Sequence, residues 1–267
     1  MAGPASPSRA RTRAGLRLTT VVLVAIALAV AVVAILVARK VTPPAAPPVP
    51  ETAAPTATGP GEAGETALAT RPMLHLPAQA AQPQAMTTTS AGPALTVPAP
   101  ASTAGRWVPG GFPATSEGAL GQLVALNETT LTAADPQVYA QSYRELAEPG
   151  APDPGSTGLA ALLRSLRSSA QLPATGSVSG LTATFRVTHG QVKGVASGGR
   201  YVVVCVLGQY SVGVNGRSVA VGVGDCQAMR WNGTEWRVAS GALAAAAPCA
   251  WPGSADAVKA GYRELVR

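Results

Sequence analysis

Residues 201–240 read YVVVCVLGQYSVGVNGRSVAVGVGDCQAMRWNGTEWRVAS and contain two Asn-Gly pairs, at 215–216 and 232–233. Asn-Gly between alternating apolar residues is the strongest short signal for a two-residue hairpin turn. A turn at Asn215-Gly216 makes paired positions sum to 431. In that register the outer face is small or polar, and the inner face is apolar, with these pairs: Val212 with Val219, Tyr210 with Val221, and Val202 with Met229. The stretch therefore predicts a long antiparallel hairpin with one side facing a core.

The second pair, Asn232-Gly233, predicts another hairpin turn directly after the second strand. A two-residue turn there sets Met229 opposite Trp236 and Arg230 opposite Glu235, the latter as an outer ion pair. A further strand is predicted before the hairpin at 181–188, where LTATFRVT alternates apolar and polar residues. We expect these segments to form one curved antiparallel sheet.

Before the sheet, the apolar period is 3.6 residues, which predicts three amphipathic helices. Their starts are marked by capping residues or by proline: Thr115 or Ser116, Asp135-Pro136, and about Ser156. After the sheet, a short closing helix is predicted, capped by Ser254 and with these inward residues: Val258, Tyr262 and Leu265. Helices, a curved antiparallel sheet and a closing helix predict an α+β fold, in the element order of a nuclear-transport-factor-2-like or cystatin-like domain.

The N-terminal region predicts a membrane anchor. Residues 18–38 hold no charge and no helix breaker, and as a helix they would span about 32 Å, close to the hydrocarbon core of about 30 Å. The roughly 7–15 apolar residues of a cleavable signal peptide make a shorter segment. Because four arginines precede the span in a basic tail at 1–17, we expect this tail in the cytoplasm and everything after residue 40 outside the cell membrane.

Residues 41–104 hold thirteen prolines among alanine, threonine and glycine. Such a segment has too little apolar surface to offset the entropy of ordering, so we expect a disordered linker, followed by a folded extracytoplasmic domain at 105–267. The net charge of +7 comes mostly from the six cations of residues 1–40. It therefore reflects membrane orientation, and we expect no direct contact with nucleic acid.

All three cysteines lie in the predicted extracytoplasmic domain, where disulfides persist. The numbers of Cys205 and Cys226 sum to 431, so the two residues lie directly opposite each other. Their pair lies nine positions, an odd number, from Val214–Arg217, which is the first hydrogen-bonded pair. They therefore form a non-hydrogen-bonded pair, with Cα atoms about 4.5 Å apart, inside the range of about 4.4–6.8 Å that a disulfide accepts. We predict a Cys205–Cys226 disulfide on the outer face and a Cys249 that is free or available for an intermolecular link. A one-residue bulge would instead leave two reduced thiols.

The sequence contains no catalytic constellation and no cofactor motif, and its two scattered histidines with no CxxC predict no metal site. One feature points to chemistry. The register places Asp225 and Gln227 on the inner face with Tyr210, as a candidate pocket where a carboxylate with a raised pKa could act as a general base. The alternatives are that Asp225 lies at a wet mouth of the fold, or that a bulge at Gly222 or Gly224 turns it outward.

Several short motifs follow one another along the predicted domain: GFPATSEGALGQL (111–123), QVKG (191–194), VVCVLGQYSV (203–212), GVGDCQAMRW (222–231), AWPG (250–253) and AGYREL (260–265). Together they resemble a group of uncharacterised, membrane-anchored actinobacterial proteins that are typically encoded within integrative or conjugative elements. The architecture is also similar to that of the bitopic inner-membrane assembly subunit of type IV secretion and conjugation systems, which carries an extracytoplasmic nuclear-transport-factor-2-like domain.

These likenesses imply a non-enzymatic scaffold that lies in the lipid bilayer through residues 18–38, associates with itself and binds other membrane proteins of a secretion machine. Two alternatives stay open. A cone-shaped ligand-binding or enzymatic domain would need a deep pocket around Asp225. A cell-wall-binding module would need an exposed aromatic platform, for which Trp107 and Trp251 are the candidates.

Overall fold

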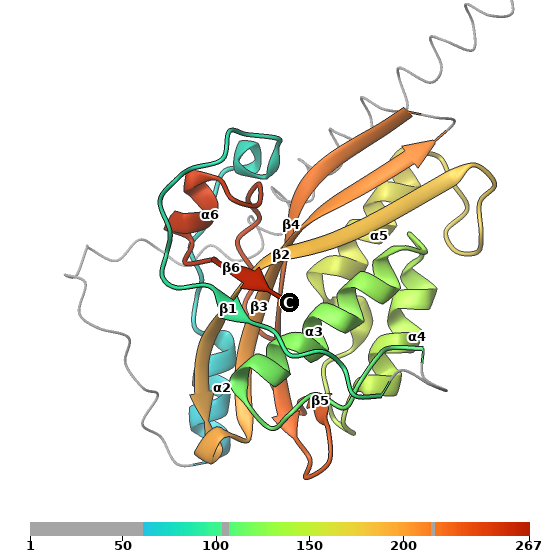
Figure 1. The fold of residues 1–267 in the computed structure, drawn as a ribbon. Coiled ribbons are helices and arrows are strands. Elements are labelled where there is room, and N and C mark those ends of the chain that lie inside the picture. The colour runs from blue at the N-terminus through green and yellow to red at the C-terminus, as the bar shows by residue number, and fades with distance from the viewer. Residues whose placement is uncertain (1–60, 103–106, 215–216) are drawn as a thin grey trace, which may run out of the picture.

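The structure, a computed structural model, describes residues 61–102, 107–214 and 217–267. They form an α+β fold in which a curled, half-barrel sheet packs against helices (Figure 1). The strand order is β1-β6-β2-β3-β4-β5, and all neighbours are antiparallel except β1 and β6. The strands are β1 (Leu95–Thr96), β2 (Leu181–Ala196), β3 (Tyr201–Val214), β4 (Arg217–Trp231), β5 (Trp236–Val238) and β6 (Arg263–Val266).

The predicted hairpin register is confirmed along its whole length. β3 and β4 pair without a bulge, and every pair of positions sums to 431. The turn at 215–216 lies outside the described residues. Register shifts occur in β2 instead, between Val187 and His189 and between Val192 and Gly194. Such shifts bend a strand and increase its twist, which fits the curl of this sheet.

The second turn is wider than predicted. Trp231 pairs with Trp236, which leaves a loop of four residues between them. The cause is Asn232, whose side-chain Oδ1 accepts hydrogen bonds from two later main-chain N–H groups of the loop, both at 2.9 Å. The expected pairings of Arg230 with Glu235 and of Met229 with Trp236 are therefore wrong, because Arg230 lies opposite Arg237 and Met229 opposite Val238. Because the slip is even, the same side chains still face the core.

Three helices cover the inner face of the sheet: α3 (Ser116–Leu131), α4 (Pro136–Leu146) and α5 (Gly158–Ser169) (Figure 1). The predicted caps of the first two are confirmed, because Thr115 and Asp135 accept main-chain N–H bonds at 3.0 and 2.7 Å. The third helix starts two residues later than Ser156, which closes the 3-10 turn η2 (Pro154–Ser156). Helices and sheet enclose one continuous apolar core.

Residues 61–102, which we call the strap, are folded. The sequence predicts a disordered linker at 41–104, and that expectation is wrong for this part. These residues form α2 (Glu62–Thr70), which lies on the outer face of the sheet, the 3-10 turn η1 (Ala78–Ala81), and β1, which pairs with β6 at the edge of the sheet and buries Leu95 in the core beneath the helices. Leu68 and Ala69 of α2 are 2% and 0% exposed. The helix approaches closely because the facing residue is Gly194, where a Cβ would lie 2.6 Å from Leu68. Residues 1–60, with the predicted span at 18–38, lie outside the described residues.

The C-terminal segment differs from the predicted closing helix. Ser254 caps α6 (Ala255–Lys259) as expected, but the helix ends before Gly261, whose φ of +86° suits glycine. The chain then forms β6 between β1 and β2, so Leu265 lies in a strand. No helix within the described ranges is both long enough and apolar enough to cross a membrane.

Candidate functional site

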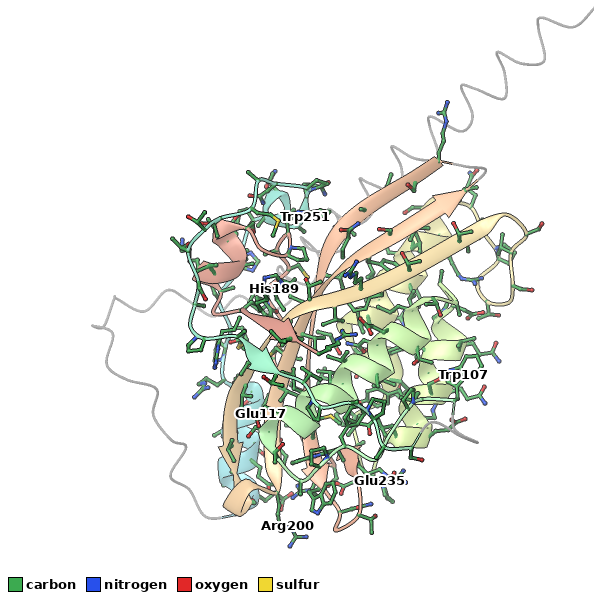
Figure 2. The ribbon with its side chains drawn as sticks, viewed as in Figure 1. Trp107, Glu117, His189, Arg200, Glu235 and Trp251 are labelled. Atoms are coloured by element: carbon green, nitrogen blue, oxygen red, sulfur yellow. A yellow bond between two sulfur atoms is a disulfide. The ribbon has the colours of Figure 1, made fainter. Side chains whose placement is uncertain are left out.

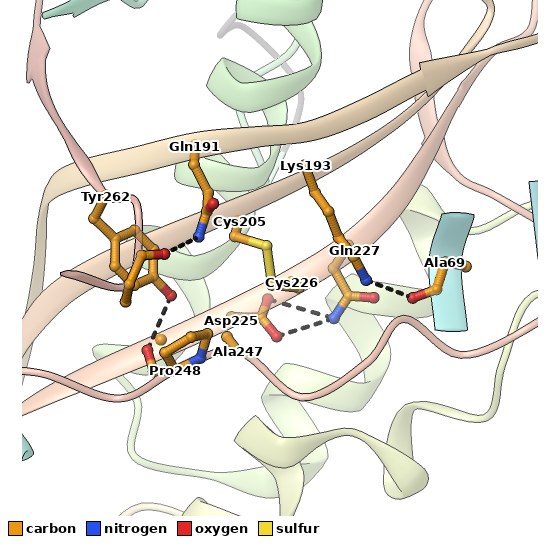
Figure 3. Close-up of a disulfide and its surroundings, with 12 residues drawn as sticks. Ala69, Gln191, Lys193, Cys205, Asp225, Cys226, Gln227, Ala247, Pro248 and Tyr262 are labelled. Carbon is orange, nitrogen blue, oxygen red and sulfur yellow. Dashed lines mark hydrogen bonds between the residues drawn. A yellow bond between two sulfur atoms is a disulfide. The ribbon is translucent and has the colours of Figure 1, made fainter. Parts of the chain in front are cut away.

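Asp225 lies on the inner face of β4, as the register predicts, and it is 5% exposed. Its Oδ2 accepts a hydrogen bond from Asn127 Nδ2 of α3 at 3.0 Å. Its Oδ1 accepts one from Gln227 Nε2 at 3.1 Å (Figure 3). β4 runs without a bulge and the carboxylate is enclosed, so both the wet mouth and the outward turn are wrong.

The electrostatics of this carboxylate follow from its enclosure. Burial raises the pKa of Asp225 to about 6, and the two amide hydrogen bonds offset only part of that rise. Both donors are neutral. Burial and then the charge of Asp225 also raise the pKa of the nearby Tyr143 hydroxyl. Among the described residues, neither Tyr143 OH nor Asn127 Oδ1 has a hydrogen-bond partner. Asp225 therefore sits in a buried polar cluster inside an otherwise apolar core.

Tyr210 does not join this cluster. Its hydroxyl donates to the Leu131 carbonyl at 3.3 Å, and its ring packs edge-on against Phe185 with centroids 6.1 Å apart. Two surface hollows, one beside Trp107 and one beneath α2, are lined by residues other than these. The structure thus brings Asp225 and Gln227 together and leaves Tyr210 apart, with the carboxylate sealed under α3.

The outer face carries the predicted Cys205–Cys226 disulfide between directly opposed residues of β3 and β4 (Figure 3). The Cα atoms are 4.1 Å apart, close to the expected spacing. The bond is enclosed, because Cys205 and Cys226 are 0% and 5% exposed beneath the strap and the C-terminal segment. Cys249 is a free thiol whose Sγ accepts the Gly224 N–H at 3.4 Å, and burial raises its pKa.

Charged residues fasten the strap to this face. Arg230 donates to both carboxylate oxygens of Glu65 on α2, at 3.0 and 2.6 Å, and to Glu148 at 3.2 Å. Its guanidinium lies 5.1 Å above the ring of Tyr201. Hydrogen bonding to Arg230 lowers the pKa of Glu65. We call Arg230, Glu65 and Glu148 the latch.

A second fastening lies at the other end of α2. Lys193 Nζ donates to the main-chain oxygen of Ala69 at 2.9 Å (Figure 3) and to that of Arg71 at 2.6 Å. A cation at the C-terminus of a helix meets carbonyl groups that have no partner within the helix. Burial lowers the pKa of Lys193 to about 8. Sequence reasoning missed both fastenings, although residues 61–71 contain no proline, which was the available signal for a helix.

The two tryptophans proposed as an aromatic platform lie on opposite sides of the molecule (Figure 2). Trp107 is 60% exposed, whereas Trp251 is partly buried and donates its main-chain N–H to Ala80. They do not form one surface.

No protein-family model matches the chain, and no curated protein or solved structure matches it either. In the described part of the chain, no group of three or more His, Cys, Asp or Glu side chains is placed to hold a metal ion. The Asp225 carboxyl group can hold a proton, but it is enclosed, and it lines neither of the two surface hollows.

Proposed function

We propose that this protein is a membrane-anchored, extracytoplasmic scaffold of a conjugative, type IV secretion-like apparatus, and that it acts through protein–protein contacts. The enclosure of Asp225 is the observation that carries the proposal. The carboxylate best placed for chemistry has both oxygens bound by neutral amides beneath α3. The surface hollows lie beside Trp107 and beneath α2, and neither is lined by Asp225, so we take the exposed surface to serve contacts with proteins.

Three further observations support this role. The apolar stretch at 18–38, with arginines before it, predicts a single span that leaves the domain outside the membrane. The short motifs between residues 111 and 265 resemble those of proteins encoded in conjugative elements. The α+β fold, with helices on a curled sheet, is compatible with the nuclear-transport-factor-2-like relationship that we propose. In this role the protein associates with itself and with other membrane components of the secretion machine.

A clean deletion of the gene tests this proposal. We expect transfer of the mobile element to fall by at least tenfold while growth stays unchanged, because a scaffold is needed only for assembly. The full chain, supplied from a second site, should restore transfer. Normal transfer from the deletion strain would reject the proposed function.

The raised pKa of Asp225 favours a second candidate, a ligand-binding or enzymatic domain that uses this carboxyl group. The substitution Asp225→Asn separates the two, because it keeps the shape of the side chain and removes its charge. A scaffold should transfer normally with this variant. A severe loss of transfer would favour the ligand-binding candidate, provided that the variant unfolds at a temperature at least as high as that of the wild type.

A further inference from the structure

The hairpin and the first half of β2 form a three-stranded arm made of residues 181–187, 209–214 and 217–223, which extends past the rest of the sheet (Figure 1). β5 pairs only with residues 229–231 of β4, and β6 only with residues 189–190 of β2. Among the residues that the structure describes, neither edge of the arm therefore has a neighbouring strand. Open edges are templates for pairing with another chain.

Only alternate residues of an edge strand direct their main-chain groups outward. In β4 these are the even-numbered ones, since Ala228 C=O accepts the Ala239 N–H and Gly224 N–H donates to Cys249 Sγ. Ser218 and Ala220 therefore direct their N–H and C=O groups away from β3. Within the described ranges, none of these four groups has a hydrogen-bond partner.

The opposite edge, on β2, is closed at its base by charged side chains. The Val187 N–H donates to Glu128 Oε1 at 2.8 Å, and its C=O accepts from Arg267 Nη2 at 2.8 Å. The β4 edge has no such protection along residues 218–223, which read SVAVGV and contain neither charge nor proline. Natural edge strands are usually blunted by such residues, so this edge is suited to pairing.

We infer that β4 pairs with β4 of a second copy of this chain, antiparallel and about a two-fold axis at Val219. This inference rests on the proposed scaffold function, whose self-association it assigns to a surface. The N–H and C=O groups of Ser218 then bond to the C=O and N–H groups of Ala220 of the second copy. Ala220 bonds in the same way to Ser218 of the second copy, which gives four hydrogen bonds in all. Val219, half-buried on the apolar face, meets its own equivalent.

Self-complementarity favours a second copy over a different partner. The paired stretch carries small outer-face side chains and no charge, so doubling it introduces no like-charge contact. The register between the two β4 strands follows from where the open edge of β4 ends, at Gly222. At Gly222 the Ala250 carbonyl covers the outer face so closely that an added Cβ would lie 1.8 Å from its oxygen. Centring on Val219 keeps the pairing short of that residue.

The strength of this contact follows from its size. The contact consists of four main-chain hydrogen bonds and one valine pair. The surface that it buries falls short of the roughly 1,000 Å² of an interface that is stable in solution. We therefore expect a weak dimer for protein in dilute detergent. Copies confined to one membrane have a far higher effective concentration, and there the dimer should predominate.

Cysteine cross-linking of the full-length chain in phosphatidylglycerol–phosphatidylethanolamine vesicles tests the pairing. The background is Cys249→Ser, and two size-tagged forms carry Ser218→Cys or Ala220→Cys. A hydrogen-bonded pair sets these Cα atoms about 5.5 Å apart, within disulfide range, whereas like positions lie two residues out of register and beyond about 7 Å. We expect the mixture to cross-link at least tenfold faster than either form alone.

A proline pair provides the matched control. Ala220→Pro removes an outward N–H without breaking the hairpin and should reduce the dimer fraction in vesicles at least fivefold. Ala183→Pro does the same on the β2 edge and should leave the dimer fraction unchanged. Equal cross-linking by the mixture and by either form alone, or no cross-link from folded protein, would overturn the inference.

The two proposals fail separately. If the mixture cross-links as expected but the deletion strain transfers normally, the dimer stands and the conjugative role is wrong. If the deletion abolishes transfer but the mixture does not cross-link, the role stands and this edge is not the contact.

Discussion

The two faces of the sheet are buried by different means. On the inner face, three helices contribute large side chains such as Leu120, Leu123 and Tyr139, all 0% exposed. On the outer face, α2 and the C-terminal segment contribute mostly alanines, and the latch and Lys193 hold α2 in place over the disulfide between β3 and β4. Each large side chain buries much apolar surface. Small side chains bury little, so the outer cover depends on close approach of the backbones and on a few individual polar contacts. The inner cover should therefore set global stability, and the outer cover should open locally.

The largest effect should come from truncating the inner core. Leu123→Ala removes a fully buried side chain, so we expect the free energy of unfolding to fall by about 2–5 kcal/mol in urea denaturation. The matched control is Leu68→Ala on the strap, which removes the same atoms from the outer face. It should accelerate proteolysis within residues 61–102 while costing less global stability. Equal global losses would show that the two covers unfold as one unit.

The inner face also contains a charge that opposes folding. The folded pKa of Asp225, about 6, lies above its ordinary value of 3.8, so the folded chain binds this proton more tightly and loses stability as the pH rises between these values. The gap corresponds to about 3 kcal/mol above pH 6. Asp225→Asn should therefore stabilise the protein by up to that amount at pH 7.5 and by little at pH 4.

This substitution also fits the hydrogen bonds of the cluster. An amide at 225 has one acceptor oxygen and one donor NH2 group, and rotation of the Asn127 amide turns its Oδ1 toward that NH2 group. Urea denaturation of both proteins from pH 4 to 8 provides the measurement. A variant that is less stable at every pH would show that the carboxylate stabilises the core.

The disulfide joins β3 to β4 on the outer face of the sheet, beneath the cover. Replacing both Cys205 and Cys226 by alanine should cost about 2 kcal/mol, below the roughly 3 kcal/mol of the chain-entropy model, because β3 and β4 are already paired by the hairpin. Thermal unfolding of oxidised wild type and of the double variant measures this loss. Peptide mapping of non-reduced protein provides the control. A cross-link of Cys249 to either partner would contradict the pairing.

The latch should have the smallest effect. Glu65→Gln keeps the shape of the side chain but removes its charge, and because Arg230 is 26% exposed we expect a loss of about 1 kcal/mol. The loss should appear as faster hydrogen exchange in α2 and should shrink in 1 M salt, which screens the wild-type pair. Glu62→Gln, at the exposed start of α2, provides the comparison. Uniformly faster exchange throughout the sheet would contradict a local opening.

The inner half of the fold could be predicted because its residues are large and periodic. The Asn215-Gly216 turn fixed the register of two strands, and that register located both Cys205–Cys226 and Asp225 on their correct faces. The strap could not be predicted by the same means, because an alanine-rich segment between proline-rich ones has the composition of a linker. What holds it is Gly194, which admits Leu68, and Arg230, which the wrong second turn had assigned to Glu235.

The candidate site was predicted in position but not in surroundings. Parity along β4 places Asp225 inward, yet only the packing of α3 brings Asn127 above it, 98 residues away in sequence. Tyr210 shares the same parity and was grouped with Asp225 for that reason. A strand places residues of like parity on one face, but the distance along the strand decides which of them meet.

The fastening of α2 has a mechanical consequence. Tension that reaches the described domain from its N-terminal side enters at residue 61 and meets the latch first, while Lys193 grips the far end of the same helix. The ion pair of the latch and the hydrogen bonds of Lys193 therefore bear the force one after the other, before it reaches the hydrogen bonds between β3 and β4. A pull at this end would peel the strap and expose the cystine beneath it, leaving the helices on the opposite side of the sheet in place.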